Sequence, residues 1–228
     1  MTVTTSMVQE VLENGSLMLV RQPIFQTAFR QPIGYEVLCR WPGNRYSPDE
    51  FIPVMEACGL GKELTIYVLD RLAKILKKKE KTHYWVNVPP DVLEEDPTWI
   101  IETLSETGSI HIELTERGEL GKRGLEHVGV MKREGIKIFA DDFAIDTKND
   151  RNIELFSGIK IDRKIIRDYG VSQGSRHFLN NLVKEARSMG LLTIAEGIER
   201  EEDMKIPFKL GIDYVQGYLL GMPETLVV

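Results

Sequence analysis

Two hydrophobic patterns alternate along most of the chain. Short apolar, β-rich runs predict strands, and the longer stretches between them, with apolar residues three or four positions apart, predict amphipathic helices. The expected strands are residues 16–25, 33–41, 83–88, 110–116, 136–143, 158–162, 191–199 and 213–221. The expected helices include residues 47–60, 63–79, 97–107, 124–135 and 175–190. Strands that alternate with helices predict crossover units and a mostly parallel sheet.

Local signals refine this arrangement. Ser47 and Pro48 are typical of an N-cap and a first helical residue, and the helix at 175–190 is expected to begin at Ser175 as its N-cap and to end at a glycine. Only a short link, near residues 27–32, joins the first two strands, so we expect them to pair antiparallel. No linker or internal repeat divides the chain. We therefore expect one domain, residues 1–228, with an α/β fold: a TIM-type (β/α)8 barrel with an antiparallel first strand.

Composition narrows the choice of partners and compartment. The 228 residues carry a formal net charge of -6, which argues against binding to DNA or RNA polymers. The sequence has no apolar run long enough to span a bilayer and no signal-peptide pattern. Cys39 and Cys58 have no metal-type spacing and form no disulfide framework. A cytoplasmic protein is the simplest expectation.

Polar residues recur within or at the end of many of the expected strands. They are Glu36, Asn87, Glu113, Asp141, Asp142, Lys160, Glu196 and Gln216. In a parallel barrel the strand ends meet at one mouth, where active sites lie. Carboxylate and amide oxygens suit Mg²⁺ or Mn²⁺, and the adjacent pair Asp141 and Asp142 could serve two neighbouring ions. Such two-metal sites are suited to phosphodiester hydrolysis.

Simpler roles exist for single members of this set. A lone acid at a strand end is often a helix cap or a surface charge, and Asn87 could be only a turn residue. Lys160 could be an exposed strand residue with Asp162 as its partner. Glu199, nearby, is expected to cap the following helix. Independent surface residues, however, would not be expected to recur at a similar point of so many strands.

At these residues the sequence resembles the EAL-domain family, bacterial phosphodiesterases that linearise cyclic di-GMP. The resemblance runs from about Met18 to Pro223, and the signature tripeptide is present as Glu36-Val37-Leu38. The other blocks are VNVPP (86–90), IELTE (112–116), ADDF (140–143), KIDR (160–163), AEGIE (195–199) and DYVQGYLLGMP (213–223). The resemblance implies a barrel whose first strand runs antiparallel.

The resemblance also implies roles for the matching residues. The ligands of a first metal would be Glu36, Asn87, Glu113 and Asp141, and Asp142 would serve a second. Lys160 would help to position the attacking water, and Glu196 would be the general base or a second-metal partner. The dinucleotide would be held by Gln22, Leu38 and Arg40, with Gln216 lining the site near the metals. The expected product is linear pGpG.

One loop departs from the family pattern. The family follows its Asp-Asp-Phe with a stretch close to Gly-Thr-Gly-Tyr-Ser-Ser, whereas residues 144–150 read AIDTKND and contain no glycine. The resemblance makes Glu116 the anchor of this loop, and it implies a homodimer through the region around Asn152 to Phe156. Three functions remain open: an active phosphodiesterase, a non-catalytic cyclic di-GMP receptor that signals through an unknown protein partner, and a protein-interaction module.

Overall fold

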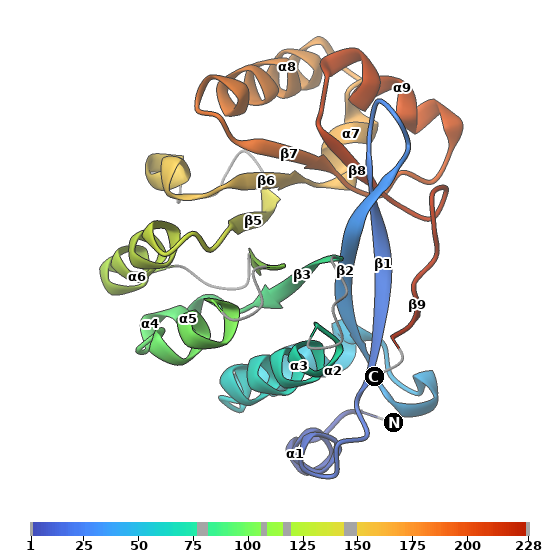
Figure 1. Ribbon diagram of the computed structural model, residues 1–228. Coiled ribbons are helices and arrows are strands. Elements are labelled where there is room, and N and C mark those ends of the chain that lie inside the picture. The colour runs from blue at the N-terminus through green and yellow to red at the C-terminus, as the bar shows by residue number, and fades with distance from the viewer. Residues whose placement is uncertain (1, 77–81, 106–108, 116–119, 144–149, 227–228) are drawn as a thin grey trace.

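A closed barrel forms the centre of the molecule, and helices surround it (Figure 1). The structure is a computed structural model that describes residues 2–76, 82–105, 109–115, 120–143 and 150–226, without the side chains of residues 142, 143 and 150–152. The barrel strands are β1 (Met18–Gln26), β2 (Pro32–Arg40), β3 (His83–Val88), β4 (Ile110–Leu114), β5 (Ile138–Phe143), β6 (Gly158–Ile161), β7 (Leu192–Ala195) and β8 (Tyr214–Gln216).

Strand order follows chain order around the barrel. Neighbours from β2 to β8 are parallel, while β1 lies antiparallel to both β2 and β8 and closes the sheet. The TIM-type barrel with an antiparallel first strand is therefore confirmed. Strand β8 pairs with residues 24–26 of β1, and a short strand β9 (Glu224–Thr225) pairs with residues 20 and 21. The segment after β8 thus completes the barrel wall beside β1.

The helices lie around the barrel, and among the described residues none is long and apolar enough to cross a membrane. They are α1 (Thr5–Glu13), α2 (Pro48–Ala57), α3 (Gly61–Leu76), α4 (Pro90–Glu94), α5 (Thr98–Ser105), α6 (Lys122–Arg133), α7 (Arg163–Asp168), α8 (Gln173–Ser188) and α9 (Glu201–Leu210). Two 3-10 helices, η1 (Pro42–Asn44) and η2 (Asp150–Leu155), join strands to helices or to other strands. Helices α1, α4 and α7 add to those that the hydrophobic pattern predicted.

The helix caps agree in part with the sequence. Ser47 precedes α2 as predicted, and its backbone N–H donates to the Glu50 carboxylate at 2.8 Å, as in a capping box. Helix α8 begins one turn earlier than expected. Its cap is Ser172, whose Oγ accepts from the Ser175 backbone N–H at 3.0 Å, so the predicted cap at Ser175 was wrong.

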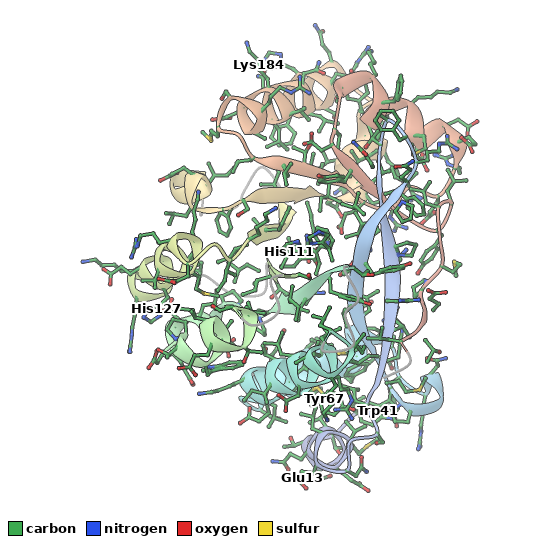
Figure 2. The ribbon with its side chains drawn as sticks, viewed as in Figure 1. Glu13, Trp41, Tyr67, His111, His127 and Lys184 are labelled. Carbon is green, nitrogen blue, oxygen red and sulfur yellow. The ribbon has the colours of Figure 1, made fainter. Side chains whose placement is uncertain are left out.

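An aromatic layer fills the barrel beneath the polar strand ends. The ring of Trp85 packs edge to face with the rings of His111 and Phe139, at centroid distances of 4.7 Å and 5.9 Å. Figure 2 shows His111 inside the molecule. Gly158 makes room for this layer, because a Cβ there would lie 2.5 Å from Cε1 of Phe139. Each of the three aromatic residues lies two positions before a predicted site residue, so the polar side chains point into the same barrel interior.

Candidate functional site

The Lys160 ammonium lies at the point where carboxylates from four strands or strand ends meet. Its Nζ is 2.6 Å from Oε1 of Glu196, 3.1 Å from Oε2 of Glu113, 3.1 Å from Oδ1 of Asp141 and 3.6 Å from Oε2 of Glu36. The lysine side chain is only 1% exposed. The alternative that Lys160 is an exposed strand residue is therefore wrong.

Amide side chains hold Glu36 from both sides. Nδ2 of Asn87 donates to its Oε1 at 2.9 Å, and Nε2 of Gln216 donates to its Oε2 at 2.7 Å. Gln216 also lies 3.4 Å from Oε1 of Gln22, whose own Nε2 donates to the Gly221 carbonyl at 3.2 Å. Asn87 is thus more than a turn residue, since its amide reaches the carboxylate cluster.

Charge in this cluster is unevenly compensated. Burial works against a charged lysine, but the surrounding carboxylates outweigh it and raise the pKa of Lys160 well above its ordinary value. Burial, together with the neighbouring acids, raises the pKa of Glu113 well above its usual range and that of Glu196 to about 8. The pKa of Glu36 is lowered despite its burial, by the Lys160 charge and the two amide donors. One ammonium cannot neutralise four carboxylates, so the site favours an additional cation.

The side chains present fit a hard divalent cation. Oε1 of Glu113 is buried and has no hydrogen-bond partner among the described residues, and the other donors are carboxylate and amide oxygens of the kind that Mg²⁺ and Mn²⁺ take. Within the same described residues, no group of three or more acid, imidazole or thiol side chains is already arranged to hold a metal ion. The side chain of Asp142 lies outside the described residues, so its predicted part in a second metal site stays a prediction.

Two cavities, each of about 300 Å³, flank the cluster and share Glu36 and Leu38 in their walls. The first, which we call the apolar cavity, is bounded by Arg40, Pro48, Ile52, Glu56, Leu64 and Val68, among others. The second, which we call the polar cavity, is bounded by Gln22, Arg163, Glu196, Glu199, Gly217 and Tyr218, among others. Of the three residues predicted to hold a dinucleotide, Gln22 thus lines the polar cavity, Arg40 the apolar one and Leu38 both.

Two acids near the site have roles other than those expected. Glu199 accepts hydrogen bonds of 2.6 Å from both Arg163 and Arg167 of α7, whereas the carboxylate that caps the first turn of α9 belongs to Asp203. The prediction that Glu199 caps α9 was therefore wrong. Asp162 does not pair with Lys160; its Oδ1 accepts from the Lys164 backbone N–H at 2.7 Å and caps α7.

Several predictions about the altered loop lie outside the described residues. These are the anchor Glu116 and residues 144–149. In the segment expected to contact a second copy, Ile153 and Phe156 are buried within the protein, at 7% and 3% exposure. The homodimer stays a prediction, and the described part of that segment offers few apolar side chains for it.

The sequence profile of the EAL domain matches residues 5–223. This chain belongs to the EAL domain family. Curated relatives include the cyclic di-GMP phosphodiesterases PdeF and PdeL of Escherichia coli (strain K12), which are 27% and 28% identical to it. These matches cover 96% and 97% of this chain but 31% of PdeF and 66% of PdeL, so the chain spans only part of the relatives' length.

Solved EAL domains share the fold of this one. The PaMucR phosphodiesterase in complex with c-di-GMP superposes with a TM-score of 0.83 at 24% identity, covering 95% of each chain. An EAL domain protein from Listeria monocytogenes EGD-e gives a TM-score of 0.85 at 20% identity, covering 98% of this chain and 94% of that one. At such identities the likeness concerns the fold alone.

Sequence reasoning missed some residues that surround the EAL site. Arg163 and Tyr218 line the polar cavity, but neither received a role from the strand-end argument. A signal was present for both, because Arg163 follows directly after a strand that bears a site residue and Tyr218 follows Gln216 by two positions. Neither residue is an acid or an amide at a strand end, which is why its position alone did not mark it as part of the site.

Proposed function

We propose that this EAL domain is a metal-dependent phosphodiesterase that hydrolyses cyclic di-GMP to linear pGpG. The observation that carries the proposal is the convergence of four carboxylates on Lys160 between two cavities. Membership of a family with relatives named as cyclic di-GMP phosphodiesterases supports it. We also propose that residues 1–228 form one domain and that it acts in the cytoplasm.

The shape and charge of the site support a cyclic dinucleotide as substrate. Such a molecule has a central ring with two phosphodiesters and one base on either side. Its bases would occupy the apolar and polar cavities, and the central ring would cross the shared wall at Glu36 and Leu38. Arg40, at the edge of the apolar cavity, offers a guanidinium fork to a phosphate, and Gln22 offers an amide on the other side.

The cluster residues divide into holding and proton-transfer roles. Mg²⁺ or Mn²⁺ would be held by Glu36, Asn87, Glu113 and Asp141, with Asp142 serving a second ion. A bound divalent cation lowers the pKa of water and neutralises charge on a phosphodiester oxygen.

Lys160 and Glu196 would orient the attacking water and take up its proton. The raised pKa of Lys160 keeps it protonated, so it can orient a water molecule and balance negative charge. Glu196 lies 2.6 Å away and would accept a proton from that water in its carboxylate form, which with a pKa of about 8 becomes the major form only at mildly alkaline pH.

A receptor that binds cyclic di-GMP without hydrolysing it is the second candidate. Two observations favour it: Lys160 already draws the four carboxylates together, and the loop at residues 144–150 lacks the family's glycines. Such a receptor would signal through a protein partner. It leaves Glu196 beside Lys160 without a catalytic purpose, because binding alone needs no general base.

Product analysis separates these functions. The protein is incubated with cyclic di-GMP and Mg²⁺ or Mn²⁺, the mixture is chromatographed for pGpG, and binding is measured in parallel. Formation of pGpG that EDTA abolishes is the expected result. Binding without product would favour the receptor, and neither binding nor product would favour a protein-interaction module.

A further inference from the structure

Arg163 is the cationic side chain that borders the polar cavity beside Glu199. Its Nη1 donates to Oε1 of Glu199 at 2.6 Å, and Nη2 of Arg167 donates to the other oxygen of the same carboxylate at 2.6 Å. Arg167 does not line the cavity. Arg167, outside the cavity wall, thus holds Glu199, and Glu199 holds Arg163 at the cavity wall.

Gly197 fixes the direction of the Arg163 side chain. A Cβ at Gly197 would lie 2.4–2.5 Å from Cβ, Cγ and Cδ of Arg163, so the aliphatic stem lies flat against this glycine. Gly197 has a φ of +62°, which a residue with a side chain rarely adopts. The stem is therefore positioned before any ligand arrives, and the cost of ordering a free arginine is reduced.

The guanidinium retains hydrogen-bond donors for a ligand. Of its five N–H groups, only the one on Nη1 has a hydrogen bond within the described part of the chain, and the side chain is 51% exposed. Tyr218 lines the same cavity and is 55% exposed, and an aromatic ring is a surface on which a base can stack. A planar donor group and an aromatic ring in one cavity are the two kinds of group that proteins use to hold a nucleobase.

We propose that Arg163 reads the base in the polar cavity and selects guanine over adenine. The inference rests on the proposed binding of cyclic di-GMP. Guanine presents two adjacent acceptors, O6 and N7, which match the two parallel donors of an arginine fork. Adenine presents an amino donor at the position of O6, so the fork would face a donor and lose one of its two hydrogen bonds. Glu199 acts as the positioning residue that holds the fork in place.

Paired affinity measurements test this assignment. Binding of cyclic di-GMP and of cyclic di-AMP is measured by calorimetry, with Ca²⁺ in place of Mg²⁺ so that hydrolysis is slow. Arg163→Met should weaken cyclic di-GMP binding roughly 5- to 150-fold, the range for one bidentate arginine–guanine contact, and should weaken cyclic di-AMP binding much less, because adenine keeps only one hydrogen bond to the fork. R163K keeps the charge without the planar fork and should lose most of the guanine preference as well.

Arg167→Met is the matched control, because it removes an equivalent ion pair from Glu199 but no group from the cavity. It should keep most of the guanine preference. If Arg163→Met weakens both dinucleotides equally, or if Arg167→Met loses the preference to the same extent, Arg163 has only a structural role and the inference is overturned while the proposed function stands. A wild-type protein that binds no cyclic di-GMP and forms no pGpG overturns both.

Discussion

Nζ of Lys160 lies 2.6 Å from Oε1 of Glu196, inside a barrel whose mouth holds three further carboxylates within 3.6 Å of the same nitrogen. Two adjacent parallel strands, β6 and β7, bring the pair together. The contact joins a lysine whose pKa is raised well above its ordinary value to an acid whose pKa is raised to about 8. The same lysine thus offsets the buried acids, which stabilises the barrel centre, and lies beside the residue proposed to accept the proton.

Removal of the Lys160 charge should destabilise the metal-free protein. Lys160→Met leaves several buried carboxylates without a cation, and breaking a buried ion pair from one side costs about 3–5 kcal/mol. Urea unfolding in EDTA should show this loss, and Mg²⁺ or Mn²⁺ should restore part of it. The control is Lys62→Met, which breaks a solvent-exposed pair with Glu95 and should leave the unfolding midpoint nearly unchanged. Equal unfolding midpoints for the two variants would contradict the account.

Loss of an amide beside Glu36 should weaken metal binding. Gln216→Leu removes the donor that lies 2.7 Å from Oε2 of Glu36, and loss of a residue that orients a metal ligand typically costs roughly 10- to 100-fold in metal affinity or activity. A Mn²⁺ titration of turnover should shift to higher concentration, with partial recovery at saturation. The control is Gln173→Leu, at the exposed start of α8, which should not change the Mn²⁺ concentration that gives half-maximal turnover. If the Gln216→Leu titration curve matches that of the wild type, Gln216 does not help to orient the metal ligand Glu36.

His111 should make the protein less stable in mild acid. Burial and the nearby charges of His83 and Lys137 lower its pKa to about 3, whereas the unfolded chain takes up the proton near pH 6.5. Because the folded state binds fewer protons, this contribution is complete above about pH 6.5 and is lost as the pH falls toward 3. The loss reaches about 2 kcal/mol at pH 5.

His111→Phe provides the comparison, because it keeps an aromatic ring between Trp85 and Phe139 and cannot titrate. Urea midpoints at pH 7.5 and pH 5 should differ less for this variant than for the wild type. If both proteins lose the same stability over that interval, the His111 imidazole does not carry the pH dependence.

The altered loop carries a prediction from sequence alone. Replacement of residues 144–150 by Gly-Thr-Gly-Tyr-Ser-Ser introduces backbone freedom after Asp-Asp-Phe that glycine provides and the present residues do not. Turnover should rise, or less metal should be required for half-maximal rate. A fall in turnover with unchanged melting temperature would mean that the present loop is adapted to this site.

The barrel could be predicted because each of its strands carries its own local signal. The predicted strand ends are wrong where an apolar run continues past the end of the strand. The runs at 191–199 and 213–221 extend through Gly197 and Gly217, but β7 ends at Ala195 and β8 at Gln216. Gly197 turns the chain with positive φ, and Gly217 lies so close to Ile198 that a Cβ would meet its carbonyl oxygen at 2.1 Å. These glycines mark turns and close packing, which hydrophobicity does not reveal.

The sequence could predict which residues belong to the site, but not which of their side chains contact one another. Strand position identified the acids and Lys160, but it could not decide whether Lys160 is buried among the acids or exposed, since both kinds of lysine have the same local sequence. The Glu199 contact with Arg163 joins segments that only the barrel brings together. Pairings between distant segments depend on the closed fold, so strand-by-strand reasoning assigned Glu199 to the helix next to it.

The most direct test of the central claim is the initial rate of pGpG formation from cyclic di-GMP in saturating Mg²⁺ or Mn²⁺. Wild-type protein is compared with Glu196→Gln and with Glu202→Gln, an exposed control in the first turn of α9. The account predicts a rate for Glu196→Gln that is lower by roughly 10²- to 10⁴-fold with binding retained, and a rate for Glu202→Gln near that of the wild type. Turnover by Glu196→Gln at the wild-type rate, or no pGpG from the wild type with either metal, would contradict it.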